Sequence, residues 1–145
     1  MTSLKFELQL SAQKEKLMNL SVDYANYTNY LPNQIKSVIV LEKKYEDVIT
    51  EETLSFGTLK KTIIQKSLHR KIDSSRLYTE IISGPFKGSQ VIATYEENSK
   101  GTLVKVDADL KLPLRYKLLS ILVQRSYKMV LTSVLYKMNT AAISS

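Results

Sequence analysis

The chain of 145 residues contains no cysteine, only four glycines and only three prolines. Without cysteine there is no disulfide, no thiolate metal ligand and no thiol nucleophile, which favours a cytoplasmic location. So little glycine and proline leaves little material for linkers, and 43% hydrophobic residues are enough for a sizeable core. The sequence predicts one domain over residues 1–145, with neither a leader peptide nor an uncharged apolar run long enough to span a membrane.

Acidic residues are missing altogether after Asp109, although six cations follow it. The first 109 residues hold 15 Lys or Arg against 14 acids, so nearly all of the net charge of +7 lies in the C-terminal segment. Two interpretations fit: a solvated helix face, or a surface that meets an anionic partner such as a membrane headgroup layer or RNA phosphates. The anion-contacting candidates on the predicted helix are Arg115, Lys117, Arg125, Lys128 and Lys137.

The same segment predicts one long helix from Pro113 to about Ala142. Proline suits a first helical turn because its missing N–H would be unpaired there. Apolar residues recur at three- and four-residue intervals and form one stripe, which must cover another element. The stripe contains Leu114, Leu118, Leu119, Leu122, Val123, Tyr127, Val130, Leu131, Val134, Leu135 and Met138.

Upstream of this helix, period-two alternation predicts strands, beginning with Leu4, Phe6, Leu8 and Leu10. Two short helices follow, after an N-cap at Ser11 and again before Leu31-Pro32. We expect helices at 13–20 and 23–30, and further strands at 34–43, 48–56, 59–71, 76–82, 89–96 and 102–112, with Gly57 as a break.

The final hairpin can be specified to the residue, because the turn Asn98-Ser99-Lys100-Gly101 pairs Glu97 with Thr102. Tyr95 then faces Val104, and Ala93 faces Val106, on one apolar face. Successive hairpins give an antiparallel sheet with one dry face, which the long helix covers. The predicted fold class is therefore α+β: a curved antiparallel sheet of about seven strands around a C-terminal helix.

Three segments resemble the START-like (SRPBCC) superfamily, in its polyketide cyclase and coenzyme Q-binding branch. They are Asp23-Tyr24 through Tyr30-Leu31-Pro32, the loop Ile81-Ile82-Ser83-Gly84-Pro85-Phe86-Lys87-Gly88, and Gly101-Thr102 with Val104-Lys105-Val106-Asp107. The resemblance covers the chain end to end and implies the helix-grip fold. It also implies a cavity between sheet and helix for an apolar small molecule such as a lipid, an isoprenoid quinone or a polyketide.

The apolar candidates for the lining of such a cavity come from both layers. Taken singly, each also fits an ordinary core position. They are Phe6, Leu8, Leu54, Phe56, Val91, Ala93, Val104, Val106, Leu119, Leu122, Val123, Tyr127 and Val130.

Polar candidates follow from strand register. If Leu54 and Phe56 face inward, so do Glu52 and Thr50; the opposite register buries Ile49 and stays open. Tyr78 and Glu80 share a face with Ile82, and Gln65 and Ser67 share one with Ile63. A carboxylate in an apolar cavity has a raised pKa and can hydrogen-bond a ligand or transfer a proton. Tyr27 belongs to a tyrosine series (24, 27, 30) that we expect to pack at the core and cavity entrance.

Catalytic signals are otherwise few. The single histidine, His69, lies between Leu68 and Arg70 and is expected at the surface. No metal-binding, phosphate-binding or nucleophile motif occurs, so no metal or cofactor is predicted. The favoured function is an apolar-ligand carrier. The alternatives are a cyclase-type enzyme and a protein- or ribosome-interaction module, whereas nucleic-acid stacking is disfavoured because no cations accompany the tyrosines.

Overall fold

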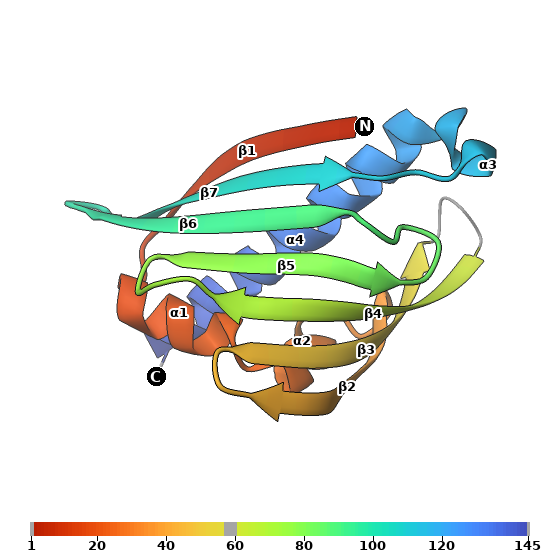
Figure 1. The fold of residues 1–145 in the computed structure, drawn as a ribbon. Helices are drawn as coiled ribbons and strands as arrows, with labels where there is room; N and C mark the ends of the chain where they lie inside the picture. Colours follow the sequence, from red (N-terminus) through yellow and green to blue (C-terminus); the bar gives the residue numbers. More distant parts are fainter. Residues whose placement is uncertain (1, 57–60, 145) are drawn as a thin grey trace.

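The computed structural model describes residues 2–56 and 61–144, which form one curved sheet and one long helix (Figure 1). In chain order, the elements are β1 (Thr2–Leu10), α1 (Lys14–Ser21), the 3-10 helix η1 (Tyr24–Asn26), α2 (Tyr27–Tyr30), β2 (Ile35–Lys44), β3 (Asp47–Phe56), β4 (Lys61–Lys71), β5 (Arg76–Ser83), β6 (Gln90–Asn98), β7 (Gly101–Leu110), α3 (Leu114–Lys117) and α4 (Ser120–Ser144). The expected break at Gly57 and the start of the next strand at Leu59 lie outside the described residues.

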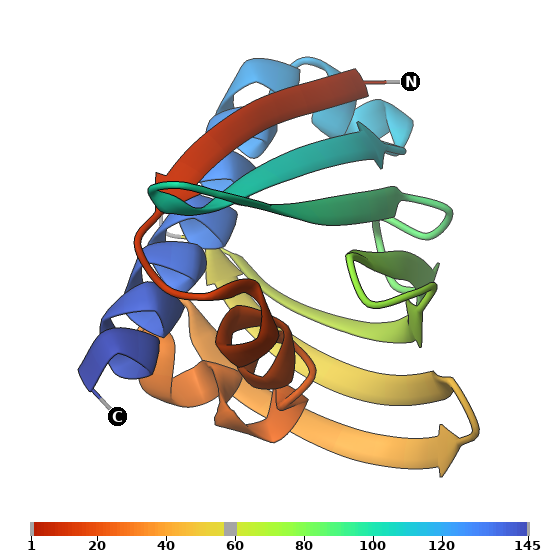
Figure 2. The same cartoon turned by 90° about the vertical axis from the view of Figure 1, so that its left-hand side faces the viewer.

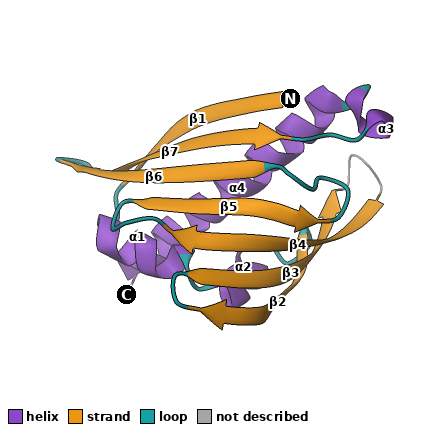
Figure 3. Ribbon diagram, in the orientation of Figure 1, coloured by secondary structure: helices purple, strands orange, loops and turns teal. Residues whose placement is uncertain are grey.

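The seven strands form one sheet in the order β1-β7-β6-β5-β4-β3-β2, and every neighbouring pair is antiparallel. Apart from the β1–β7 pair, each strand pairs with the next one along the chain, so hairpins build the sheet. Figure 2 shows the sheet curving around α4, and Figure 3 shows helices on its concave side. This is the α+β helix-grip architecture expected from the sequence.

The last hairpin has the predicted register. Glu97 pairs with Thr102, Tyr95 with Val104 and Ala93 with Val106. Gly101 closes the turn with a φ of 129°, a backbone conformation that L side chains rarely adopt.

The C-terminal helix differs from the prediction of one continuous helix starting at Pro113. Pro113 is the N-cap of α3, and a turn at 118–119 separates α3 from α4. No glycine or proline marks this break. Instead, the Tyr116 ring turns inward against Phe86, with ring centroids 5.4 Å apart, so tertiary packing overrides the helical periodicity of the sequence.

Two smaller expectations at the helix starts also change. Gln13, and not Ser11, is the N-cap of α1, and the expected second helix is divided into η1 and α2. Neither change moves the short helices from their place beside the sheet.

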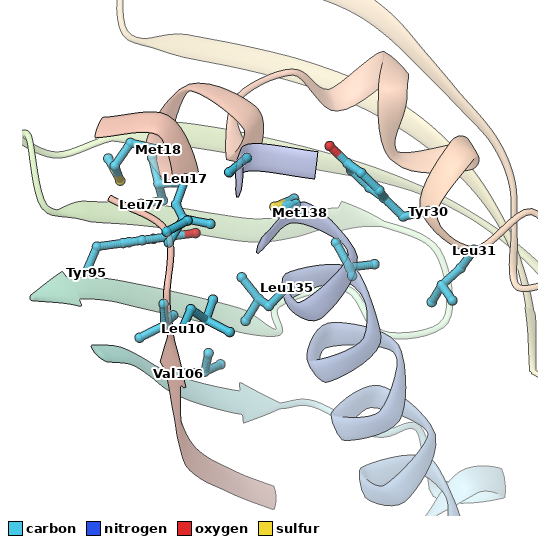
Figure 4. Close-up of a cluster of buried hydrophobic side chains, with 14 of the residues drawn as sticks. Leu10, Leu17, Met18, Tyr30, Leu31, Leu77, Tyr95, Val106, Leu135 and Met138 are labelled. Carbon is cyan, nitrogen blue, oxygen red and sulfur yellow. The ribbon is translucent and has the colours of Figure 1, made fainter. Parts of the chain in front are cut away.

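The largest buried cluster lies between α1, α4 and the concave face of the sheet. In Figure 4, Leu135 of α4 faces Leu10 and Val106, and Met138 lies near the short helices. Val104 and Leu17 are fully buried in this cluster. A second cluster, around Phe86, fills the opposite end of the interface between sheet and helix. The space between the two clusters contains the candidate site.

Candidate functional site: a cavity with a buried polar wall

A cavity of about 200 Å³ lies between the concave face of the sheet and α4, and most of its lining is apolar. Its walls come from β2 to β7, α1, η1, α2 and α4. The lining residues are Ser21, Tyr24, Tyr27, Ile35, Val38, Thr50, Glu52, Leu54, Phe56, Gln65, Ser67, His69, Leu77, Thr79, Ile81, Val91, Ala93, Tyr95, Val106, Tyr127, Val130, Leu131, Val134, Leu135 and Met138.

The polar part of the lining comes from three neighbouring strands, because every second residue of a strand faces the same side. The β3–β4 register places Thr50 beside Ser67 and Glu52 beside Gln65. The two registers left open for β3 are thereby decided: Thr50 and Glu52 face the cavity. A continuous polar wall results on an otherwise apolar surface.

His69 is the centre of this wall, contrary to the expectation that it lies at the surface. It is only 8% exposed. Its Nε2 lies 2.9 Å from the Thr50 hydroxyl and its Nδ1 lies 2.9 Å from the Thr79 hydroxyl, while the Tyr24 ring stacks on it at 4.0 Å between centroids. The alternation of side chains along a strand could have found this position, because Ile63, Gln65 and Ser67 face inward and the next residue on the same face is His69.

Burial lowers the pKa of His69 to about 4, so the imidazole is neutral at pH 7. A neutral imidazole has one N–H donor and one acceptor nitrogen. The hydroxyls of Thr50 and Thr79 can each donate or accept, so they satisfy either tautomer. His69 is therefore a fixed, uncharged part of the wall.

Glu52 is the second titratable group in the wall, and its environment raises its pKa. Burial raises the pKa to about 7, against the opposing effect of hydrogen bonds from the side chains of Ser67, Gln65 and Thr50. The Ser67 hydroxyl donates to Glu52 Oε2 at 2.9 Å. Glu52 Oε1 lies 4.0 Å from His69 Nε2, but the neutral imidazole makes this a contact between a carboxyl group and an uncharged ring. Glu52 is thus poised to gain or lose a proton near neutral pH.

Two buried polar atoms in the lining make no hydrogen bond of ordinary geometry among the described residues, although a weak hydrogen bond between the Gln65 and Tyr127 side chains opposes the rise in the Tyr127 pKa that burial causes. The two atoms are Gln65 Oε1 and the Tyr127 hydroxyl oxygen. A buried polar group without a partner costs about 1–3 kcal/mol. A bound molecule with a hydrogen-bonding group could pair with them, as could ordered water.

Nine of the sequence candidates line the cavity: Tyr27, Glu52, Leu54, Phe56, Val91, Ala93, Val106, Tyr127 and Val130. Eight do not: Phe6, Leu8, Tyr78, Glu80, Val104, Leu119, Leu122 and Val123.

Each displaced candidate has a structural reason. Leu77, Thr79 and Ile81 face inward, so Tyr78 and Glu80 lie on the outer face, where the Tyr78 hydroxyl donates to Glu80 at 2.8 Å. The break before α4 leaves Leu119 and Leu122 38% exposed each. Phe6, Leu8 and Val104 pack in the larger core cluster, and Val123 packs in the cluster around Phe86.

No metal site accompanies the polar wall. Within 2–56 and 61–144, no group of three or more His, Cys, Asp or Glu side chains is arranged to hold a metal ion. The polar groups that face the cavity are the Glu52 carboxyl group, the His69 imidazole, several hydroxyls and the Gln65 amide.

No protein-family model matches the sequence, and no curated protein matches it by sequence. Solved structures do match. A protein from Thermus thermophilus superposes with a TM-score of 0.85 at 18% identity, covering 99% of this chain and 98% of the other. A START superfamily protein from Mycobacterium smegmatis gives 0.79 at 13% identity, covering 98% and 97%.

The di-domain ARO/CYC StfQ from the steffimycin biosynthetic pathway gives a TM-score of 0.84 at 6% identity. The match covers 98% of this chain and 51% of StfQ, so the chain spans about half the length of that protein. The chain therefore has the START-like helix-grip fold. Since one such fold carries many functions, the function must be argued from the cavity.

Proposed function

We propose that the protein binds an apolar small molecule carrying one uncharged hydrogen-bonding group, and that it acts as a carrier of this molecule. The observation that carries the proposal is the pair of atoms without an ordinary hydrogen bond, Gln65 Oε1 and the Tyr127 hydroxyl, in a mostly apolar cavity. Apolar walls with a few placed polar groups are typical of small-molecule sites. The ligand's hydroxyl or carbonyl would lie at the polar wall and its hydrocarbon part against Val106 and Val130.

Cavity size narrows the ligand class. About 200 Å³ is smaller than the roughly 300–1,000 Å³ typical of ligand pockets and equals the volume of about seven waters. A compact molecule fits this space, whereas a long isoprenoid chain would require the walls to part. A ligand carboxylate is disfavoured, because it would lie beside Glu52, whose own charged form is already destabilised by burial.

Substitution of the cavity wall tests the proposal. Val106 is 4% exposed and lines the cavity, so Val106→Trp fills the space with an indole. Leu122→Trp adds the same group to the same interface region at a position 38% exposed, and is the matched control. Native mass spectrometry of protein purified from its own host should show a bound small molecule on wild type and on Leu122→Trp, and none on Val106→Trp.

Circular dichroism checks that the variants fold, and Ala93→Phe provides a second, smaller filling substitution of the same cavity. Wild-type protein that carries no small molecule, or folded cavity-filled variants that carry the same molecule as wild type, would contradict the proposal.

A second candidate function is cyclase-type catalysis, favoured by one observation. Glu52 has a pKa of about 7 and faces the cavity, which is the condition for general acid or base catalysis near neutral pH. Under this alternative, Glu52→Gln abolishes turnover of a bound substrate while ligand affinity stays nearly unchanged. If the protein is only a carrier, neither wild type nor Glu52→Gln converts the bound molecule into a product.

A further inference from the structure

The outer side of α3 and the start of α4 expose apolar side chains, among them Leu114, Leu118 and Leu122, which the sequence assigned to the buried stripe. Leu118 is 97% exposed, Leu114 80% and Ile121 63%. We call these three residues, with the 38% exposed Leu122, the α3 surface. Scattered exposed leucines are ordinary, but four within nine consecutive residues form a patch.

Helical geometry explains why these side chains face outward together. Tyr116 and Val123 are 4% and 0% exposed and fix the inward side. A residue two positions away on a helix is rotated by about 200°. Leu114 and Leu118 flank Tyr116 by two positions, and Ile121 precedes Val123 by two. Burial of Tyr116 and Val123 therefore turns Leu114, Leu118 and Ile121 toward solvent, with Leu122 at the edge of the α3 surface.

Cations surround the α3 surface. Lys111, Arg115, Lys117 and Arg125 are all exposed, and the chain has no acidic residue after Asp109. Within 2–56 and 61–144, none of the four forms an ion pair. Arg115 lies over the Tyr116 ring at 5.2 Å from its centroid.

The other two cations of the segment differ in position. Lys128 follows Arg125 by three residues and Ile121 by seven in α4, so it lies on the same side of the helix, one to two turns further along. Lys128 is over the Phe6 ring, 5.7 Å from its centroid. Lys137 follows it by nine residues, which is about half a turn away around the helix. Lys137 therefore lies away from the other cations that follow Asp109, whereas Lys128 continues the basic side of the α3 surface along α4.

We propose that the α3 surface docks the protein on an anionic phospholipid membrane, with Leu118 and Ile121 inserted among the lipids and the surrounding cations against the headgroups. Exposed leucines ringed by Lys and Arg match both layers of a bilayer interface. Leu118 is almost fully exposed, so it can enter a lipid layer without moving neighbouring side chains. Surfaces for single-stranded RNA combine cations with exposed aromatic rings for stacking, whereas the aromatic ring of α3, Tyr116, is buried and the exposed residues beside the cations are aliphatic.

This docking is separate from ligand binding in the cavity. No helix of the described chain is long and apolar enough to cross a membrane, and the α3 surface shares no residue with the cavity lining. Its test can therefore succeed or fail whatever the cavity binds.

Vesicle flotation of the full chain tests the proposal, using phosphatidylcholine vesicles with and without phosphatidylserine. Wild type should float with the anionic vesicles, and binding should weaken as salt rises. Lys117→Gln with Arg125→Gln should reduce binding roughly 25-fold, at about fivefold per cation. Leu118→Gln with Ile121→Gln should reduce it by about tenfold or more.

Matched controls use similar residues elsewhere. Lys36→Gln with Lys137→Gln removes two exposed lysines, and Ile39→Gln with Ile64→Gln removes two isoleucines 52% and 60% exposed; both pairs should bind like wild type. Because the chain has no tryptophan, Leu118→Trp reports insertion by a blue shift of emission on anionic vesicles, and Ile64→Trp should show none. The cavity-filled Val106→Trp should also bind vesicles like wild type.

Equal binding to neutral and anionic vesicles would overturn the proposal. So would unchanged binding of the Leu118→Gln, Ile121→Gln variant, or binding to RNA in place of vesicles. If vesicle binding is seen and the cavity experiment fails, docking stands without the proposed carrier function.

Discussion

Glu52 and His69 lie 4.0 Å apart, and burial moves their pKa values in opposite directions. The folded state keeps the Glu52 proton up to a pKa of about 7, compared with an ordinary 4.5. In the folded state His69 is protonated only below a pKa of about 4, compared with an ordinary pKa of 6.5. By linkage, Glu52 makes the fold less stable as pH rises from 4.5 to 7, and His69 makes it less stable as pH falls from 6.5 to 4. The two effects oppose each other between about pH 4.5 and 6.5.

The first residue-scale prediction isolates Glu52 through Glu52→Gln, which keeps the shape and does not titrate. Relative to wild type, the variant should gain about 3 kcal/mol of unfolding free energy between pH 4.5 and pH 7 and above. Urea unfolding followed by circular dichroism at a series of pH values measures the difference. His69→Gln is the control, since its relative stability should grow in the opposite direction, below pH 6.5. Parallel pH profiles for wild type and Glu52→Gln would refute the burial of this carboxyl group.

The second residue-scale prediction concerns the Tyr127 hydroxyl group. Tyr127→Phe removes a buried polar atom that makes no hydrogen bond of ordinary geometry among the described residues, so ligand-free protein should become about 1 kcal/mol more stable. Ligand affinity should fall roughly two- to tenfold. Tyr95→Phe is the matched control: the Tyr95 hydroxyl lies 2.7 Å from Ser21 Oγ, so its loss should destabilise the fold. Thermal unfolding and ligand titration of both variants give the comparison.

Individual residues show where the sequence was sufficient for the site and where it was not. Leu54 and Phe56 indicated that Glu52 faces inward, but Ile49 offered an equally regular opposite face, and only pairing with β4 decides between them. His69 was missed because its charged neighbours suggested a surface. The polarity of sequence neighbours indicates burial or exposure only on average, whereas the alternation of side chains between the two faces of a strand is strict.

At the scale of elements, the β6–β7 hairpin was predictable to the residue because a short turn and a matched apolar face specify the same register. The beginning of the long helix could not be predicted in the same way. Leu114, Leu118 and Leu122 have the periodicity of a buried stripe, but the helix breaks where Tyr116 packs on Phe86. Nothing local in the sequence reports that contact between distant segments.

The hairpin turn carries the element-scale prediction, through Gly101→Ala. A Cβ at Gly101 would lie 2.3 Å from the backbone oxygen of Leu10, and its φ of 129° adds strain. We expect a loss of about 2–4 kcal/mol in unfolding free energy. Gly88→Ala is the control: it has a φ of 93°, but its Cβ would meet the movable Lys111 side chain, so the loss should be smaller. Equal losses in chemical denaturation would show that strain alone, and not the backbone contact, sets the effect.

At the scale of the molecule, the fold followed from its order of hairpins and one long helix, and matching structures at 18% identity or less show that this order is compatible with very different sequences. The cavity could be expected from the fold, but its size could not. One end of the cavity is bounded by Phe56 and Tyr127, which pack with Phe86. The volume that such interlocking side chains leave depends on many small contacts, which the sequence does not specify.

Those aromatic rings connect the cavity to the α3 surface. Phe56 and Tyr127 line the cavity with ring centroids 5.4 Å apart, and Phe86 lies 5.8 Å from Tyr127 and 5.4 Å from Tyr116. Tyr116 is the anchor beneath the α3 surface. If a ligand moves Tyr127 and docking moves Tyr116, the two events are allosterically coupled, and thermodynamic reciprocity applies. Whatever factor the bilayer imposes on ligand affinity, the ligand then imposes on affinity for the bilayer. Equal vesicle binding by wild type and Val106→Trp, as expected above, corresponds to a factor of one, and any difference between them measures the coupling through these rings.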